Sequence, residues 1–251
     1  MKKFEIPEIK IPDDFVFEWP EKHIKTCITY WFPKLEGLPV PKTHIIKTGI
    51  TPEEQIRYAD CDNIMEDKIQ KLVTDIKTHA DDLGYPAFLR TGQTSAKHEW
   101  KDTCFLKDDQ RIRYQVDRII LFSCLVDMIG LPADVWAVRE FLPLEYAFKA
   151  FDEMPIAREF RFFIEGGRIT HEQPYWPPDT IKDPDTDDWE YKLAEISLLD
   201  DKDALSLAYE VADRFKDDEG FSVDVCKTIN GEWYITDMAL AEYSYKWEPE
   251  K

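Results

Sequence analysis

Apolar residues recur at helical spacing in three stretches of the chain. Between residues 52 and 83 they fall on one face of a helix, and the same spacing returns over 109–129 and 203–216. In the first stretch that face carries Ile64, Ile69, Leu72, Val73 and Ile76. Thr51, which is followed by a proline, is typical of a helix start, and Gly84 is typical of a helix end. The pattern therefore predicts three amphipathic helices.

Short apolar runs bounded by Gly, Pro and polar residues predict strands between these helices. Single strands are expected within 38–47, 85–90, 103–107 and 135–142. Residues 1–37 are rich in prolines and aromatic residues, which favours an irregular arm followed by a strand. Residues 174–188 are rich in Pro and Asp and predict an exposed loop. Because the other strands arrive as hairpins, with helices between them, we expect an α+β fold with antiparallel sheets.

The segment 221–240 predicts a hairpin with its turn at Asn230-Gly231, the strongest short signal for a two-residue type I′ turn. In that register the residues next to the turn pair with each other, and Asp224 lies opposite Asp237. Their Cβ atoms are then roughly 4.5–5.5 Å apart, where like charges destabilise a sheet. A cation should lie between them, and a divalent cation with oxygen ligands is a natural candidate. The alternative is a solvated edge hairpin whose two acids are separated by water.

A second hairpin is predicted over 158–172, with its turn at the Gly-Gly pair. That register sets Arg161 opposite Glu172. Arg161 then forms only a cross-strand ion pair, or Arg158 or Arg161 reaches a phosphate or a substrate carboxylate. The segment alone leaves both interpretations open.

A loop of small residues over 91–100 joins two predicted strands. Its backbone N–H groups are expected to be accessible, and Arg90 at its start and Lys97 within it add positive charge. This combination suits a polyphosphate. The loop lacks the GK[ST] element of a Walker A motif, and the alternative is an ordinary hydrophilic loop.

The strand over 135–142 is followed directly by Pro143. A strand that ends at a proline leaves backbone groups free to read the flat edge of a base, with Glu140 as an acceptor. The alternative is a plain edge strand.

Charge and cysteine usage narrow the classes of partner and compartment. The chain has 32 Lys and Arg against 51 Asp and Glu, a net charge of −19, so its field repels polyanions and we expect no nucleic acid partner. No apolar run is long enough to span a membrane, and the first residues do not form a secretory signal. The 5 cysteines form no CxxC pair, which suits a reducing compartment. These features predict a cytoplasmic protein with no membrane partner.

The order of these motifs resembles the ATP-grasp superfamily, in particular the R2K-clade ATP-grasps and the D123 cell-division-cycle family. Phe88-Leu-Arg-Thr with Ser95-Ala-Lys is similar to the D123 pattern of apolar-Arg-Ser followed by Ser-Pro-Lys. Arg158-Glu-Phe-Arg-Phe-Phe is similar to REFRxF. Val223-Asp with Trp233-Tyr-Ile-Thr-Asp is similar to Asp followed by Trp-apolar-Ile-Asp-Phe-Asn. The resemblance spans roughly Leu38 to Glu242.

The resemblance implies an ATP-grasp-like α+β fold, in which two α+β subdomains with antiparallel sheets hold ATP between them. It implies an N-terminal arm and pre-ATP-grasp subdomain over 1–83. A small subdomain with the phosphate loop and hinge strand would cover 84–142. A large subdomain with the metal-binding hairpin would cover 143–251.

The resemblance also implies roles for individual residues. Arg90 would take the position of the usual phosphate-contacting lysine, and Lys97 with its loop would cover the phosphates. Asp224 and Asp237 would hold Mg²⁺. The adenine-reading hinge would comprise Glu140, Phe141 and Leu142. Ala239 stands where the family has Asn, so one metal ligand is missing, which affects turnover more than nucleotide binding.

The activity implied is that of an ATP-dependent ligase that joins a carboxylate to an amine or a thiol through an acyl phosphate, with ATP and Mg²⁺ as cofactors. Its substrates would be small molecules or peptides, and Arg158 or Arg161 would orient the acid. The alternative is a nucleotide-binding assembly factor of the D123 type, weakly catalytic or non-catalytic, with a protein partner. Ala239 and the acidic surface favour this alternative. A third hypothesis is an α+β binding module that binds no nucleotide.

Overall fold

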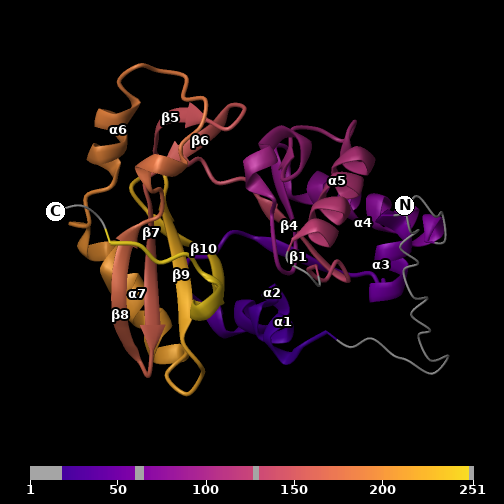
Figure 1. The fold of residues 1–251 in the computed structure, drawn as a ribbon, viewed down its shortest axis with the longest axis horizontal. Helices are drawn as coiled ribbons and strands as arrows, with labels where there is room; N and C mark the ends of the chain where they lie inside the picture. Colours follow the sequence, from indigo (N-terminus) through magenta and orange to yellow (C-terminus); the bar gives the residue numbers. More distant parts are fainter. Residues whose placement is uncertain (1–18, 60–64, 127–129, 249–251) are drawn as a thin grey trace, which may run out of the picture.

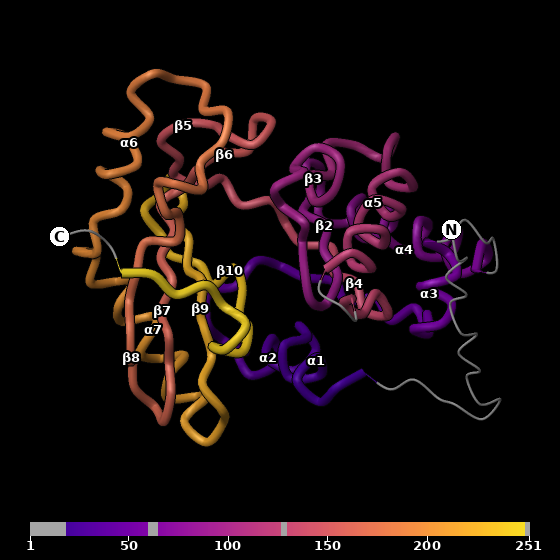
Figure 2. The backbone as a smooth tube through the Cα atoms, viewed as in Figure 1, coloured from indigo at the N-terminus to yellow at the C-terminus, as the bar shows by residue number. Residues whose placement is uncertain are grey.

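Antiparallel sheets form the framework of the molecule (Figure 1). The computed structural model describes residues 19–59, 65–126 and 130–248, and within these ranges the strands form two four-stranded sheets and one two-stranded sheet. The two larger sheets lie side by side, each with its own helices, as the backbone trace also shows (Figure 2). Helices mixed with antiparallel sheets confirm the predicted α+β class.

The first four-stranded sheet, called the small sheet here, has the strand order β1-β4-β2-β3. Its strands are β1 (Thr43–Lys47), β4 (Val135–Glu140), β2 (Ala87–Thr91) and β3 (Phe105–Leu106). The helices packed against it are α3 (Pro52–Ala59), α4 (Glu66–Leu83) and α5 (Ile112–Leu125). Leu89 and Val138 point into this helical core. Because side chains alternate along a strand, Arg90 and Arg139 point to the opposite face.

The helix predicted over 52–83 is present as α3 and α4, and residues 60–64, Ile64 among them, lie outside the described ranges. Thr51 caps α3: the Glu54 N–H donates to Thr51 Oγ1 at 3.2 Å, and the Thr51 N–H donates to a Glu54 carboxylate oxygen at 2.8 Å. Gly84 ends α4 with a φ of 85°. The strand predictions for this sheet are confirmed, although β3 has only two residues.

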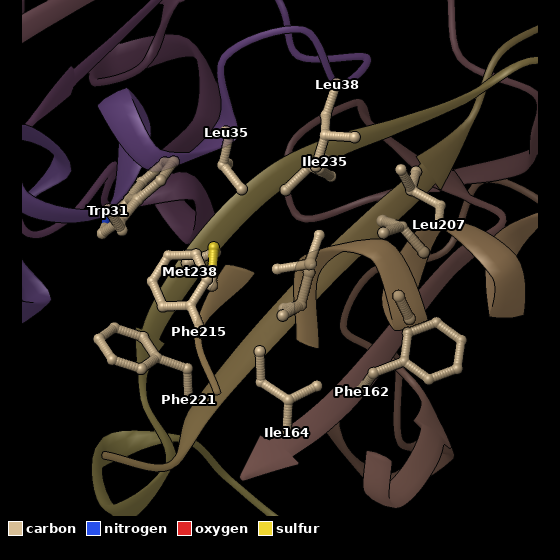
Figure 3. Close-up of a cluster of buried hydrophobic side chains, with 14 of the residues drawn as sticks. Trp31, Leu35, Leu38, Phe162, Ile164, Leu207, Phe215, Phe221, Ile235 and Met238 are labelled. Carbon is tan, nitrogen blue, oxygen red and sulfur yellow. The ribbon is translucent and has the colours of Figure 1, made fainter. Parts of the chain in front are cut away.

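The second four-stranded sheet, called the large sheet here, has the strand order β10-β9-β7-β8. Its strands are β7 (Glu159–Glu165), β8 (Arg168–Pro174), β9 (Phe221–Lys227) and β10 (Trp233–Leu240). The third predicted helix is present as α7 (Lys202–Arg214) and covers one face of the sheet. Figure 3 shows Leu207 of this helix packed with Phe162 and other apolar side chains of the sheet.

Helices replace the irregular chain and strand expected in residues 19–37, and residues 1–18, where the rest of the expected arm falls, lie outside the described ranges. Their bounds are α1 (Glu21–Thr26), α2 (Ile28–Trp31) and the 3₁₀ helix η1 (Phe32–Leu35). Ile28, Trp31 and Leu35 are fully buried against the large sheet. The expectation of a strand is wrong because Pro20 and Pro33, which suggested an irregular chain, stand at helix starts, where proline is tolerated.

A third group of elements was not predicted. It contains the two-stranded sheet of β5 (Tyr146–Ala150) and β6 (Met154–Ala157), followed later by α6 (Trp189–Ile196). Shorter 3₁₀ helices are η2 (Lys97–Asp102), η3 (Pro178–Thr180) and η4 (Ala241–Tyr243). Phe148, Trp176 and Leu193 form a separate aromatic-rich core with Trp100 of η2. This core ties η2 to the strands that follow β4.

The turn between β9 and β10 differs from the predicted one. The Thr228 N–H donates to the Glu232 carbonyl at 2.9 Å, and the Gly231 N–H donates to the Thr228 carbonyl at 2.9 Å. Ile229, Asn230 and Gly231 therefore form a three-residue loop, and the two-residue turn is wrong. Gly231 has a φ of 83°, the left-handed conformation that ends such a loop and that glycine adopts without strain.

A β-bulge restores the predicted pairing of the two acids. Strand β10 starts one residue out of the expected register, with Trp233 opposite Lys227. The register shifts at Thr236, so that Asp237 pairs with Asp224 as predicted. The opposition of the two aspartates is thus confirmed, but the bulge produces it rather than the turn.

A second bulge overturns the pairing expected for Arg161. The register of β7 and β8 shifts between Phe163 and Ile164, and Arg161 lies opposite Gln173 instead of Glu172. The predicted register assumed a regular ladder from the Gly-Gly turn, and one extra residue on β8 moves every later pair by one position. The ion pair expected with Glu172 is therefore wrong.

The predicted three-part division at residues 84 and 143 stays a prediction. Strand β1 from the first part lies in the small sheet, whereas α2 from the same part packs in the core of the large sheet. Among the helices of the described ranges, none combines the length and the apolar character that a membrane span requires.

Phe221→Ala should destabilise the fold by about 3–5 kcal/mol, since it removes a large side chain from a packed core and leaves a cavity. Phe221 is fully buried and its ring lies 5.0 Å from that of Phe215. Thermal or urea denaturation measures the loss. Tyr209→Ala is the control, because Tyr209 is 54% exposed, and it should change the stability by less than about 0.5 kcal/mol. Equal losses in the two variants would contradict the packing described.

Candidate functional site

A cavity of about 390 Å³ lies where the small and the large sheets face each other. Pockets that hold small molecules are of roughly this size. The charged and polar side chains that line it include Arg90, Thr94, Lys97, Arg139, Glu159 and Asp237. Its apolar lining includes Phe88, Trp100, Phe141, Leu144, Met154 and Trp176. The cavity therefore combines fixed charges with aromatic surface.

Strand alternation sorts the side chains of the large sheet between the core and the cavity. Phe160 and Val223 point into the core with α7. Their neighbours Glu159, Arg161 and Asp224 therefore lie on the other face, on the side of the cavity. This face gathers most of the charged residues that the sequence singled out in the two hairpins.

Asp224 is buried and paired with Arg161. Arg161 Nε donates to one carboxylate oxygen at 2.7 Å and Nη2 donates to the other at 2.8 Å. The two residues are direct partners in the β7–β9 ladder. Burial alone would lower the pKa of Arg161, but the Asp224 carboxylate outweighs it and raises that pKa. The positive group expected beside Asp224 is thus a guanidinium in this structure.

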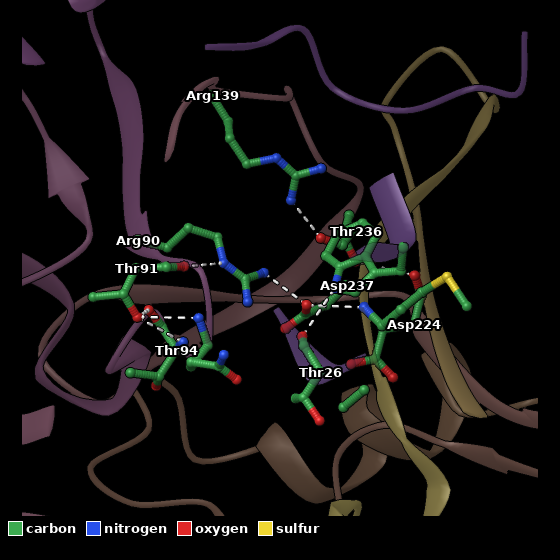
Figure 4. Close-up of polar contacts among 12 residues, drawn as sticks. Thr26, Arg90, Thr91, Thr94, Arg139, Asp224, Thr236 and Asp237 are labelled. Atoms are coloured by element: carbon green, nitrogen blue, oxygen red, sulfur yellow. Dashed lines mark hydrogen bonds and ion pairs between the residues drawn. The ribbon is translucent and has the colours of Figure 1, made fainter. Parts of the chain in front are cut away.

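Asp237 is paired with Arg90, which reaches across from the small sheet (Figure 4). Arg90 Nη1 donates to Asp237 Oδ1 at 2.6 Å, and Nε donates to the Thr91 carbonyl at 3.0 Å. Arg90 is 2% exposed, whereas the Asp237 side chain is 40% exposed. Asp237 therefore keeps part of its carboxylate open to the cavity while its charge is neutralised.

Lys97 crosses the cavity from the other direction. Its Nζ lies 3.6 Å from Glu159 Oε2 and 3.7 Å from the centre of the Tyr175 ring. Burial alone would lower the pKa of Lys97, but Glu159 and Tyr175 outweigh it and raise that pKa. For Glu159 burial dominates over the attraction of Lys97 and raises the carboxyl pKa to about 7. The loop that carries Lys97 is therefore attached to the large sheet by a charge contact.

The backbone of this loop is less accessible than the sequence suggested. The Gln93 and Thr94 N–H groups donate to Thr91 Oγ1 at 3.2 and 3.0 Å, and the Ala96 N–H donates to Thr94 Oγ1 at 3.2 Å. These backbone N–H groups, which were expected to be available to a phosphate, are therefore already hydrogen-bonded to threonine side chains of the same loop.

The segment expected to read a base lines the cavity. Glu140, Phe141 and Leu142 all contribute to its wall, where β4 ends. Glu140 Oε1 accepts a hydrogen bond from the Lys42 N–H at 2.8 Å, and the Glu140 N–H donates to the Lys42 carbonyl at 2.9 Å. Glu140 is therefore engaged with the segment before β1, which leaves the next two residues as the part of the hinge nearest to a ligand.

The structure does not bring Arg158 to the cavity. Its Nη2 donates to Asp200 at 2.8 Å and to the Leu198 carbonyl at 3.1 Å, and its guanidinium lies 5.6 Å from the Phe160 ring. Arg158 and Arg161 are three residues apart, so they point to opposite faces of the sheet.

Arg139 is a site residue that the sequence reasoning missed. It is 3% exposed, lines the cavity and reaches across to the Thr236 carbonyl of β10 (Figure 4). Burial and the neighbouring Arg90 lower its pKa to about 9, against the attraction of Asp237. The alternation of Val135, Ala137 and Arg139 on one strand face was the signal that could have revealed it.

The two aspartates fit a magnesium ion only together with a ligand. Among the residues that the structure describes, no three His, Cys, Asp or Glu side chains gather as a metal site. Ala239 pairs with Ser222 and offers no side-chain oxygen. Magnesium is commonly held by one or two carboxylates plus substrate phosphates. Asp237, whose carboxylate is partly exposed, could provide one of these carboxylates. Asp224 could provide the second if its ion pair with Arg161 opened.

Comparison with known proteins completes the description of the site. A family model described as ATP-grasp domain, R2K clade family 3, matches residues 79–244. Cdc123 from Schizosaccharomyces pombe is similar in structure with a TM-score of 0.52 and 14% identity, over 88% of this chain and 85% of that chain. The C-terminally truncated Cdc123 from the same organism gives a TM-score of 0.50 and 12% identity, over 90% of this chain and 87% of that chain.

D-cycloserine synthetase DcsG gives a TM-score of 0.49 and 10% identity, over 86% of this chain. This chain spans 62% of the length of that synthetase. No curated protein sequence matches the chain at a significant level. At identities this low, the two Cdc123 structures show a shared fold and nothing more.

Proposed function

Because the chain belongs to the ATP-grasp superfamily, R2K clade family 3, as its motif order predicted, we propose that it is an ATP-dependent ligase that uses Mg²⁺. The observation that carries the proposal is one cavity that joins charged side chains to an aromatic wall at the end of β4. A nucleotide needs both features, since its phosphates require cations and its base requires a flat apolar slot.

Different residues of the cavity suit the adenine, the phosphates and the magnesium ion of Mg²⁺-ATP. Phe141 and Leu142 would read the adenine edge with backbone groups, next to the aromatic wall. Arg90 and Lys97 would bind the phosphates, the former by turning from Asp237 and the latter by leaving Glu159. Magnesium, when bound through the aspartates, would neutralise charge on the phosphate oxygens.

The proposed reaction joins an acid to an amine or a thiol in two steps. A carboxylate oxygen of the acid attacks the γ-phosphorus of ATP, which forms an acyl phosphate and releases ADP. The amine or thiol then attacks the acyl carbon, inorganic phosphate leaves, and the nucleophile gives up its proton. Arg161 is the candidate that orients the acid, because it lies on the same face of β7 as Glu159, which lines the cavity. Arg158, on the opposite face, is not part of this proposal.

A second candidate function is that of a nucleotide-binding assembly factor with little or no turnover. Ala239 favours it, because the missing side-chain oxygen weakens metal binding more than it weakens nucleotide binding. In that case ATP would stabilise the protein without being consumed, and a protein partner would bind the nucleotide-loaded form.

Mg²⁺-ATP should raise the melting temperature by about 5 °C or more at a concentration of roughly 100 times its Kd, because it binds only the folded state. Addition of amino acids as paired acid and amine substrates should stimulate ADP formation. Asp237→Asn should lower that ADP formation by about 100-fold, since it removes a carboxylate proposed to hold the metal. Differential scanning fluorimetry and a coupled ADP assay measure the two effects.

Asp213→Asn is the matched control, since the Asp213 side chain is 78% exposed and lies away from the cavity. It should leave both measurements unchanged. If ADP formation survives Asp237→Asn, the assignment of the metal carboxylate is wrong. ATP-dependent stabilisation without ADP formation in the wild type would instead support the assembly factor, and no stabilisation by ATP would support a module that binds no nucleotide.

A further inference from the structure

Helix α6 carries apolar side chains on two of its faces. Trp189, Leu193 and Ile196 pack into the aromatic-rich core. Tyr191 is 67% exposed, and Ala194, about one turn further along, is exposed as well. A surface helix usually presents polar side chains to solvent, so a second apolar face is unusual. Figure 1 shows α6 at the outer edge of the molecule, on the side away from the small sheet.

Two leucines extend this exposed surface beyond the end of α6. Leu198 is 57% exposed and Leu199 is 36% exposed. Leu198 lies about two helical turns after Tyr191, and Ser197 between them keeps helical dihedral angles. Leu198 therefore continues the side of the helix that Tyr191 occupies. We call the surface formed by Tyr191, Ala194, Leu198 and Leu199 the α6 face.

Arg158, which does not reach the cavity of the candidate site, holds the end of the α6 face in place. Its Nη2 donates to the Leu198 carbonyl at 3.1 Å and to Asp200 at 2.8 Å. The Arg158 side chain is 17% exposed, so both contacts are largely shielded from water. The two leucines are thus presented to solvent by a fixed segment of the chain.

A second, smaller cavity of about 190 Å³ adjoins the α6 face at Leu199. Phe160, Phe162 and Leu205 give it an apolar floor. Pockets for small molecules usually have roughly 300–1,000 Å³, so this cavity suits a single side chain better than a nucleotide. Phe160 points into the core with α7, so the smaller cavity and the candidate site lie on opposite faces of the large sheet. The remaining lining residues are Glu172, Asp200, Asp201 and Lys202.

The surroundings of the α6 face are acidic. Residues 179–203 contain 10 Asp or Glu against 3 Lys. Glu190 and Glu195 are exposed on α6 itself, and no basic side chain of the described residues lies within 4.0 Å of either carboxylate. Lys192, the basic residue of α6, is paired with Asp188. An apolar face flanked by unpaired carboxylates is complementary to an apolar face flanked by lysine or arginine.

We propose that the α6 face and the adjoining smaller cavity dock a basic amphipathic helix of a protein partner. One apolar side chain of that helix enters the cavity beside Leu199. Others pack along Tyr191 and Ala194, where the small alanine lets two helices approach closely. Lysine or arginine side chains beside this seam face Glu190 and Glu195. The inference goes beyond the proposed function and does not depend on it, because the partner and ATP use different faces of the large sheet.

A labelled synthetic helix with Leu on one face and Lys on the other is the probe, and fluorescence anisotropy measures its affinity. The wild type should bind this probe at least about 10 times more tightly than a helix in which Glu replaces every Lys. Tyr191→Ser/Leu198→Ser should weaken binding at least about 10-fold, because it removes two apolar side chains from the contact. A wild type that binds neither helix, or both equally, contradicts the proposal.

Tyr114→Ser/Leu125→Ser is the matched control. These side chains of α5 are 42% and 74% exposed, but the Arg111 guanidinium lies 4.6 Å from the Tyr114 ring, so their surroundings are less acidic. The control should bind the Lys helix as the wild type does. If both double variants lose the same affinity, or neither loses any, the probe recognises no particular face and the inference is wrong.

Glu190→Gln/Glu195→Gln separates the local charge from the net charge of −19. It should weaken binding of the Lys helix at least about threefold at low salt. Glu53→Gln/Asp81→Asn removes the same charge from α3 and α4, at side chains that are 78% and 53% exposed, and should have a smaller effect. Equal effects of the two pairs would mean that only the net charge attracts the probe, which overturns the inference.

Sedimentation of the protein alone tests whether a second copy of this chain occupies the α6 face instead. The wild type should show no association that Tyr191→Ser/Leu198→Ser abolishes. If it associates with rising concentration and this variant does not, the α6 face is a contact between copies and the proposed partner is wrong. All the substituted side chains are exposed, so the variants are expected to fold as the wild type does.

Discussion

Arg161→Met is expected to destabilise the protein by about 3–5 kcal/mol, because it leaves the Asp224 carboxylate buried without a partner. Asp224 is 4% exposed, and both of its oxygens accept hydrogen bonds from Arg161. For a chain of this size the loss corresponds to a fall in melting temperature of roughly 10 °C or more. Circular dichroism during thermal unfolding measures it.

The double variant Arg161→Met/Asp224→Leu separates loss of the pair from loss of packing. Replacement of both members of a buried ion pair by apolar residues is often neutral or stabilising. The double variant should therefore recover most of the stability lost by Arg161→Met. No recovery would mean that the cost of the single change lies in packing against Tyr175, whose ring centre is 4.7 Å from the Arg161 guanidinium.

Arg90→Met is expected to weaken ATP binding by about 100-fold, since charge-assisted hydrogen bonds to phosphate contribute roughly 1.5–3 kcal/mol each. Arg90 is 2% exposed, so little water is available to take the place of its guanidinium. Titration calorimetry with ATP and Mg²⁺ measures the change. The matched control is Arg111→Met, whose side chain is 53% exposed and pairs with Asp102 outside the cavity.

Arg90→Met also tests how much the ion pair between Arg90 and Asp237 contributes to stability in the absence of a ligand. Asp237 loses its only ion-pair partner of the described chain when Arg90 is replaced. Because Asp237 is 40% exposed, water can hydrate it, and the stability should fall by no more than about 1 kcal/mol. Wild-type ATP affinity in Arg90→Met would remove this residue from the proposed phosphate site.

Local pattern predicted much of the fold, and its errors have identifiable causes. The helical spacing of Ile69, Leu72 and Ile76 was sufficient for α4, because one buried face is enough to specify a helix. The register of the β9–β10 hairpin was wrong near its turn, because the loop has three residues instead of two. The register of the β7–β8 hairpin was wrong beyond its bulge, because a bulge adds one residue to a strand without an obvious signal in composition. The opposition of Asp224 and Asp237 emerged correctly only because the bulge at Thr236 offset the longer turn.

The candidate site was predicted less completely than the fold. Arg90, Lys97 and the hinge after β4 line the cavity. Arg158 does not, and alternation alone could have separated it from Arg161. Arg139 was missed because alternation gives its strand face, and only the tertiary structure shows that this face lines a cavity.

The sequence by itself determined the class of fold, the main helices and strands, and the family to which the chain belongs, because these depend on periodicity and motif order along the chain. Only the tertiary structure decided which cations neutralise the two aspartates. Arg90 lies 147 residues from Asp237, and Arg161 lies 63 residues from Asp224. The first pair depends on how two sheets face each other, and the second depends on which distant strands pair within one sheet. No spacing along one strand encodes either arrangement.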